Sequence, residues 1–255
     1  MSKQLAIYPT FRPRGVLDPN LAVFQLNLQI LRQYLVNIAQ DLSNSDQNSG
    51  KSEMKCSGAE CGIYLAGNIQ KGHEDTSRLA WTQAHLDLLS QEVPAALTFL
   101  NPALRSDDLS DQRSVFGRDM LQVYSSDLIL VDARERRGLG VGAEMMWAKM
   151  NRLPVVIWAP KNSHYHKERA ELLGVEVENW VHPFVESLAD HLAEDLPSIV
   201  AWMVRFLEGK ISSIKGAEDI QGAMRYYLEQ QFDSDIPMQE AASANGSLRE
   251  KFLLV

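Results

Sequence analysis

The segment that decides the fold is "DLILVDARERRGLGVGAEMMWAKMNRLPVVIWAP", residues 127–160. It opens with a continuous apolar run at 127–133 and closes with a second one at 154–160. Short continuous apolar runs are typical of strands that are buried on both faces. Between them stand three glycines, followed by a stretch that predicts a helix over residues 142–151. A strand, a crossover helix and a second strand form a βαβ unit, so this segment predicts a parallel sheet.

The same alternation continues toward the N-terminus. Apolar runs predict strands at 62–67 and 96–101, and apolar spacing predicts helices at 75–91 and 114–124. We therefore expect an α/β fold, a flavodoxin/Rossmann-like doubly wound parallel sheet with extra N- and C-terminal helices. Downstream, the sequence predicts a helical turn at 166–174, helices at 184–208 and 217–232, and a loose stretch at 233–247.

The flanks suggest three parts in the chain. Asp18-Pro19 starts a predicted helix to residue 43, whose apolar residues recur at spacings of four and three. This apolar face is expected to pack on the core or across a dimer contact, and it comprises Phe24, Leu28, Leu31, Leu35, Ile38 and Leu42. A polar linker follows. The expected domains are a helical extension with linker at 1–60, an α/β domain at 61–183 and a helical extension at 184–255.

Composition narrows the classes of function. The chain has 255 residues and a formal net charge of −8 at pH 7, which argues against a nucleic-acid backbone binder. Cys56 and Cys61 form no C-x-x-C pair, and no histidine cluster has zinc spacing, so we expect no metal and reduced thiols. The start has no signal-peptide core, and the longest apolar stretch, at 198–207, is too short for a bilayer. A cytoplasmic protein without a membrane span is expected.

Three loops should converge at the carboxyl ends of the strands, where ligands bind in open parallel sheets. They are residues 66–75, 100–108 and 132–144. The last one carries Glu144, expected in the first turn of a helix, where backbone N–H groups favour an ionised carboxylate. An ionised, positioned carboxylate is what covalent attack on a sugar carbon requires. On the glycine pattern alone, Gly140 and Gly142 are ordinary strand-to-helix turn residues.

Four fragments together resemble the nucleoside 2-deoxyribosyltransferase superfamily, which includes the 2′-deoxynucleoside 5′-phosphate N-hydrolases. They are "IYLAGNI" (63–69), "RDMLQVYSSDLILVDA" (118–133), "GLGVGAEMMWA" (138–148) and "LPVVIW" (153–158). They occur in the family's order, and the resemblance covers about residues 62–160. It implies cleavage or transfer at the N-glycosidic bond of a (deoxy)nucleoside or its 5′-monophosphate, no cofactor, and a homo-oligomer whose subunits complete the pocket.

The resemblance also implies catalytic roles. Glu144 matches the nucleophile that attacks C1′ and displaces the base. Asp119, eight residues before Asp127, matches an aspartate that assists as acid or hydrogen-bonding partner. Tyr64 matches the tyrosine that orients the nucleophile. Taken alone, Asp119 is a solvated helix residue and Tyr64 a core aromatic.

For substrate binding, the resemblance implies a first ligand loop formed by Gly67, Asn68 and Ile69. Gly140 and Gly142 match small residues that let the sugar or a 5′-phosphate approach the backbone. Gly138 stands where the transferases usually carry an aspartate, and the N-hydrolase branch has a small residue there. That branch also has serines around its phosphate, which are missing from the first loop here. Arg136, Arg137 or Lys71 would have to supply the anion contacts.

Two functions stay open at this point. The first is an enzyme that cleaves the N-glycosidic bond through a glutamate nucleophile. For this enzyme, hydrolysis of a 5′-monophosphate is favoured slightly over base exchange. The alternative is a non-catalytic nucleotide-sensing or binding module on the same fold. The Gly138 departure and the non-matching flanks favour this alternative. No residue pattern supports a third idea, an NAD-consuming glycohydrolase.

Overall fold

The computed structural model describes residues 60–67, 81–252 and 254. All of them belong to the second of two compact units, Met54–Val255, the first being Met1–Glu53. The predicted N-terminal helix and linker, most of the first ligand loop and Cys56 lie outside the described residues.

The core is a five-stranded parallel sheet with the strand order β2-β1-β3-β4-β7. The strands are β1 (Glu60–Ala66), β2 (Ala96–Leu100), β3 (Leu128–Asp132), β4 (Val155–Trp158) and β7 (His191–Ala193). β1, β3 and β4 are apolar and largely buried because helices cover both faces. This is the predicted flavodoxin/Rossmann-like α/β fold.

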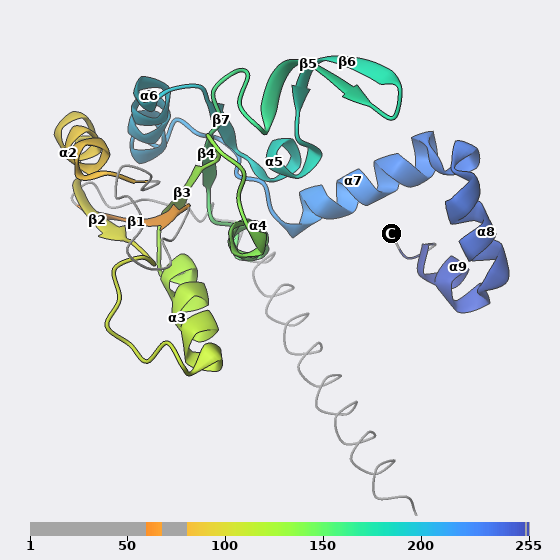
Figure 1. Cartoon of the computed structure of the whole chain (residues 1–255), viewed down its shortest axis with the longest axis horizontal. Helices are drawn as coiled ribbons and strands as arrows, with labels where there is room; N and C mark the ends of the chain where they lie inside the picture. The colour runs from red at the N-terminus through yellow and green to blue at the C-terminus, as the bar shows by residue number, and fades with distance from the viewer. Residues whose placement is uncertain (1–59, 68–80, 253, 255) are drawn as a thin grey trace, which may run out of the picture. The chain divides into compact units, whose positions relative to one another are not determined.

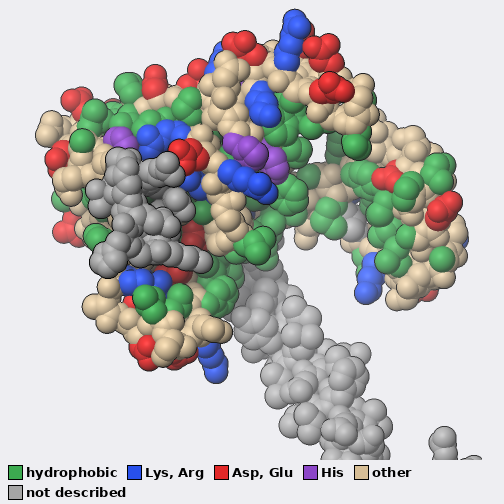
Figure 2. Space-filling view, viewed as in Figure 1, with side chains coloured by type: hydrophobic (Ala, Val, Ile, Leu, Met, Phe, Trp, Pro, Cys, Tyr) green, Lys and Arg blue, Asp and Glu red, His purple; other side chains and the backbone are tan. Residues whose placement is uncertain are grey.

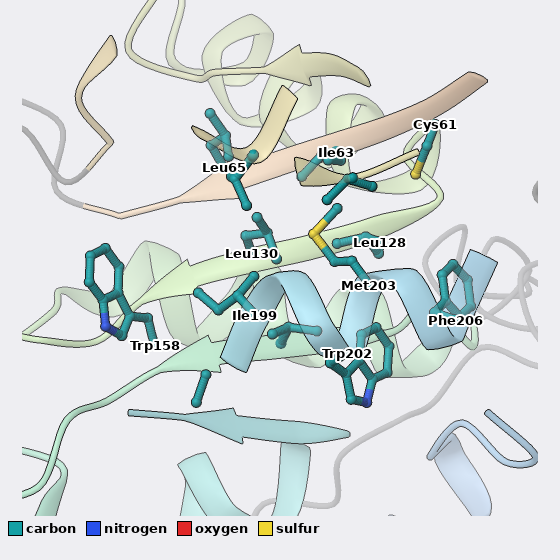
Figure 3. Packing of buried hydrophobic residues seen from close by; sticks show 14 of the residues in the cluster. Cys61, Ile63, Leu65, Leu128, Leu130, Trp158, Ile199, Trp202, Met203 and Phe206 are labelled. Atoms are coloured by element: carbon teal, nitrogen blue, oxygen red, sulfur yellow. The ribbon is translucent and has the colours of Figure 1, made fainter. Parts of the chain in front are cut away.

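Alternation along the strands divides the interior into two layers. Ile63 and Leu65 face α2 (Gln83–Glu92) and α6 (Leu196–Leu207), and Figure 3 shows this packing against Ile199 and Met203 of α6. Residues of the opposite parity, such as Tyr64, face α3 (Gln112–Tyr124), α4 (Leu139–Met150) and α5 (Pro183–Leu188). Figure 1 shows α2 and α6 on one side of the sheet and α3 and α4 on the other.

Helix starts follow local capping chemistry. Thr82 and His85 form a capping box at α2, Asp111 accepts the backbone N–H groups of Arg113 and Ser114 at α3, and Asp195 caps α6. The α4 start is different, because Gly138 is the N-cap residue and offers no side-chain hydrogen bond. The first N–H groups of α4 therefore receive no hydrogen bond from the cap residue's side chain.

A buried ion pair joins α4 to the far edge of the sheet. Lys149 Nζ donates to Asp190 Oδ2, and the two side chains are 1% and 4% exposed. Asp190 also accepts the backbone N–H groups of Val155 at 2.7 Å and Lys215 at 2.8 Å. This carboxylate therefore ties α4, β4 and the segment before α7 (Ala217–Gln230) together.

The helical turn predicted at 166–174 is wrong. Strands β5 (His166–Leu172) and β6 (Val175–Val181) form an antiparallel hairpin there. Leu173 and Gly174 both have positive φ, at 52° and 82°. The two-residue turns that match the twist of a β-hairpin require this conformation. The largely exposed hairpin carries charges along both strands, so it lacks the apolar run by which the other strands were predicted.

The long helix predicted at 184–208 is also wrong, because α5, β7 and α6 occupy this stretch. Pairing of β7 with β4 interrupts the helical pattern. The sheet therefore extends beyond residue 183, the predicted end of the α/β domain. The stretch 233–247, predicted to be loose, contains η2 (Phe232–Ser234), α8 (Ile236–Ala244) and the start of α9 (Gly246–Phe252). Asp235 caps α8 by accepting the Met238 N–H.

Across residues 60–67, 81–252 and 254, every helix is too short or too polar to traverse a lipid bilayer.

Candidate active site

Tyr64 and Glu144 meet in the layer between the sheet and helices α3 and α4. Tyr64 lies near the carboxyl end of β1 and is 0% exposed, and Glu144 is 7% exposed on α4. The Tyr64 hydroxyl and Glu144 Oε2 are buried, and neither has a partner with hydrogen-bond geometry among the described residues. A buried polar group without a partner costs about 1–3 kcal/mol. Two such atoms at one place mark a candidate ligand site.

The pKa of the Glu144 carboxyl is determined by the groups packed around it and not by the N-terminus of the helix. Because α4 begins at Leu139, Glu144 lies in the second turn, and the predicted first-turn position is wrong. The effect of a helix end falls off within one turn. Burial raises the pKa of Glu144 to about 7, the nearby Tyr64 hydroxyl works against this shift, and the negative charge of Asp119 adds to it. The carboxyl therefore changes protonation state near neutral pH.

Asp119 reaches the same cluster from α3. Burial raises its pKa, while the positive charges of Arg105 and Arg118 act in the opposite direction. Its Oδ1 lies 3.6 Å from Arg105 Nη1 and 3.5 Å from Arg118 Nη1. The Asp119 charge also contributes to the raised pKa of both Tyr64 and Glu144. The structure thus brings together all three residues predicted to be catalytic.

Two arginines at this site, Arg105 and Arg118, were not predicted from the sequence. Arg105 makes a bidentate pair with Asp107, at 2.9 Å and 2.6 Å, which lowers the pKa of Asp107 to about 2. Arg118 donates to the Leu104 carbonyl at 2.7 Å. Both line an open recess of about 470 Å³ with Leu104, Ser106 and Asp107. The signals were present, since Arg105 lies in one of the three convergent loops and Arg118 adjoins Asp119.

The glycines at the start of α4 divide between two sides of the helix. A Cβ on Gly140 would lie 3.8 Å from Glu144 Oε1, so Gly140 keeps the space beside this carboxylate open. Gly138, Gly142 and Arg136 line a different cavity that does not include Glu144. Residues two apart on a helix point about 200° away from each other, whereas residues four apart share a face. Of the predicted α4 glycines, only Gly140 therefore adjoins Glu144.

The other residues predicted to bind the substrate lie in different places, and some of them are outside the described residues. Gly67 directly follows β1, half-buried, while Asn68, Ile69 and Lys71 lie outside the described residues. Arg137 is held at the end of β3, where its guanidinium pairs with Asp132 at 2.7 Å. It is therefore not available as an anion contact at Glu144.

His166, at the start of β5, is a buried histidine. His166 Nδ1 lies 3.0 Å from the Ala159 carbonyl, in the interior. Within the described part of the chain, no three His, Cys, Asp or Glu side chains gather closely enough to hold a metal ion.

Comparisons with known proteins add little to the fold. No protein-family model and no curated protein matches the sequence. Among solved structures, a conserved protein from Enterococcus faecalis V583 is similar at 16% sequence identity and a TM-score of 0.44. The match covers 57% of this chain and 98% of the other.

Proposed function

We propose that this protein cleaves the N-glycosidic bond of a (deoxy)nucleoside or its 5′-monophosphate, with Glu144 as the nucleophile. The observation that carries the proposal is that buried Glu144 and Tyr64 lie close to half-buried Asp119, each from a different element. The Tyr64 hydroxyl and Glu144 Oε2 have no partner in good hydrogen-bond geometry among the described residues, although they are close enough to shift each other's pKa. The resemblance of residues 62–160 to the deoxyribosyltransferase superfamily supplies the reaction class.

The proposed reaction has two steps. A Glu144 carboxylate oxygen attacks C1′ of the sugar, the C1′–N bond breaks, and the base leaves with the bonding electrons. Asp119, whose pKa is raised by burial, donates a proton to the departing base. Water then cleaves the glycosyl ester, or a second base takes the sugar. Tyr64 orients the carboxylate, and Gly140 leaves room for the sugar beside it.

Charge around the site favours a 5′-monophosphate as the substrate. Arg105 and Arg118 line the recess beside Asp119, and Asp107 offsets part of their charge. Guanidinium groups are well suited to phosphate recognition. We therefore propose hydrolysis of a 5′-monophosphate in preference to base exchange, by a homo-oligomer in the cytoplasm.

The test measures base release from a panel of deoxynucleosides and their 5′-monophosphates, with and without an added free base. Glu144→Gln keeps the shape and removes the attacking charge, so we expect base release to be lost while the fold is retained. Glu240→Gln, an exposed carboxyl on α8, is the matched control and should behave like wild type. Full activity in Glu144→Gln would overturn the enzymatic proposal. Faster cleavage of the unphosphorylated substrates, with exchange onto the added base, would favour the transferase.

One observation favours the alternative, a nucleotide-sensing module. With a pKa of about 7, a large share of Glu144 is protonated at neutral pH and can donate a hydrogen bond to a ligand. A sensor would bind a 5′-monophosphate in a calorimetric titration but release no base from it over a long incubation. An enzyme would release base faster as the pH rises through 7, because the nucleophile must be ionised.

A further inference from the structure

A second cavity, of about 670 Å³, lies beside α4 on the side away from Glu144. Its apolar wall comes from β3, α4 and α5 and includes Val131, Val141, Met145, Met146, Val185 and Leu188. The volume falls within the range of small-molecule sites, about 300–1,000 Å³. Glu144, Tyr64 and Asp119 are absent from the lining, so this cavity is separate from the candidate active site.

Aromatic side chains form one wall of this cavity. The rings of Tyr165 and His182 lie 5.4 Å apart at 84°, and those of His182 and Phe184 lie 6.0 Å apart at 41°. Phe184 remains 67% exposed although it lines the cavity. Aromatic rings prefer edge-to-face or offset contacts at about 4.5–7 Å. A flat ring placed here would find both kinds of contact and would cover the exposed phenyl group.

A polar atom in the same wall has no partner. His182 Nδ1 is buried and makes no hydrogen bond with any described group. The backbone around it is held in place, since the His182 N–H donates to the Tyr165 carbonyl at 2.8 Å. The Tyr165 hydroxyl in turn accepts the Arg137 backbone N–H at 2.8 Å. The wall is thus preorganised, with one imidazole nitrogen left for a ligand.

The charge of the lining is positive. It contains Arg136 and Arg137 and no carboxylate, although the chain has a net charge of −8. Acidic side chains are scattered over the face shown in Figure 2. Asp132 binds Arg137 and Arg134, whereas exposed Arg136 forms no ion pair within the described residues. The uncapped first turn of α4, at Gly138, adds backbone N–H groups to this side.

We infer that this cavity is a binding site for a small aromatic anion, such as an aromatic carboxylate. The ring lies among Tyr165, His182 and Phe184, and the anionic group meets the Arg136 guanidinium. This inference is independent of the function proposed for Glu144.

The probe for the test is 8-anilinonaphthalene-1-sulfonate, an aromatic anion whose fluorescence rises in apolar surroundings. We expect one saturable site in the folded wild-type protein. Gly142→Leu places a side chain in the cavity, where a Cβ meets nothing within 4 Å, and should weaken binding by at least about tenfold. Leucine is a better helix former than glycine, so the variant should fold. Gly222→Leu on α7, also without a Cβ contact within 4 Å, is the matched control.

The anionic contact is tested separately. Arg136→Ala, at an exposed position, should weaken binding by about tenfold and reduce its salt dependence. 2-Naphthoate should displace the dye, whereas neutral 2-naphthylmethanol should compete much less well. Glu144→Gln should bind the dye as wild type does, which separates this site from the candidate active site. Equal affinity in wild type and Gly142→Leu, or equal displacement by the acid and the alcohol, would overturn the inference.

Discussion

The Tyr64 hydroxyl and the Glu144 carboxyl lie together in the interior, and each shifts the pKa of the other. Burial is the main cause of the raised pKa of Tyr64, and the neighbouring Glu144 raises it further. In the other direction, the Tyr64 hydroxyl lowers the pKa of Glu144 against the stronger effect of burial. One comes from β1 and the other from α4, so the pair exists only when α4 is packed on the sheet.

The first prediction follows from this pair. Tyr64→Phe removes the group that favours ionised Glu144, so the pKa of Glu144 should rise further. The limb of kcat/KM that increases with pH should then move to higher pH. Tyr226→Phe, at an exposed position on α7, should move neither quantity. An unshifted pH limb in Tyr64→Phe would separate Tyr64 from the chemistry.

The second prediction concerns stability and pH. The pKa of Glu144 is about 7 in the folded state, against an ordinary value of 4.5. The folded state therefore binds this proton more tightly, and the stabilisation is complete below about pH 4.5 and lost as pH rises through 7. A difference of this size corresponds to about 3 kcal/mol.

Urea unfolding at several pH values between 5 and 8 measures this loss. The difference in unfolding free energy between wild type and Glu144→Gln should shift against wild type as pH rises. His191, whose pKa is lowered by burial, contributes with the opposite sign but equally in both proteins, so the comparison cancels it. A difference that is flat with pH would mean that Glu144 is solvated.

The third prediction separates stability from activity at Gly140. Gly140→Ala should raise the free energy of unfolding by up to about 1 kcal/mol, because alanine is the better helix former and its Cβ makes only an ordinary contact with Glu144 Oε1, at 3.8 Å. The same methyl group occupies space that the sugar needs, so base release should fall. Gly117→Ala on α3, where a Cβ meets nothing within 4 Å, should change stability without the same loss. Unchanged turnover in Gly140→Ala would show that the substrate does not approach there.

The fourth prediction compares two ion pairs. Asp190→Ala leaves the Lys149 ammonium buried without its partner, and it should lower the free energy of unfolding by about 3–5 kcal/mol. Glu218→Ala removes the partner of Arg152, with side chains 50% and 65% exposed, and should cost less than about 1 kcal/mol. Denaturant titrations of both variants give the comparison. Similar costs would show that the Lys149–Asp190 pair is solvated.

The local sequence pattern was sufficient to predict the strands of the sheet up to residue 160. Four of its five strands, β1 to β4, are continuous apolar runs bounded by turn residues, and such runs carry their own signal. β7 is three residues long and owes its extended form to pairing with β4. The β5–β6 hairpin has charged residues on both strands, and its turn contains Leu173 at positive φ, which no turn rule predicts for leucine. Those elements depend on partners elsewhere in the chain.

The sequence by itself determined that a strand, a glycine-rich turn and a helix carrying Glu144 follow one another, because these are local patterns. The start of α4 at Leu139, which puts Gly140 on the face of Glu144 and turns Gly142 away from it, was not predicted. Only the tertiary structure decided what each face meets. Tyr64 and Asp119 come to Glu144, and aromatic side chains and Arg136 surround the other side. The raised pKa of Glu144 is likewise a result of the tertiary structure. Desolvation follows from the packing of α4 against other elements, among them α3, β3 and β4, and the helix by itself does not provide it.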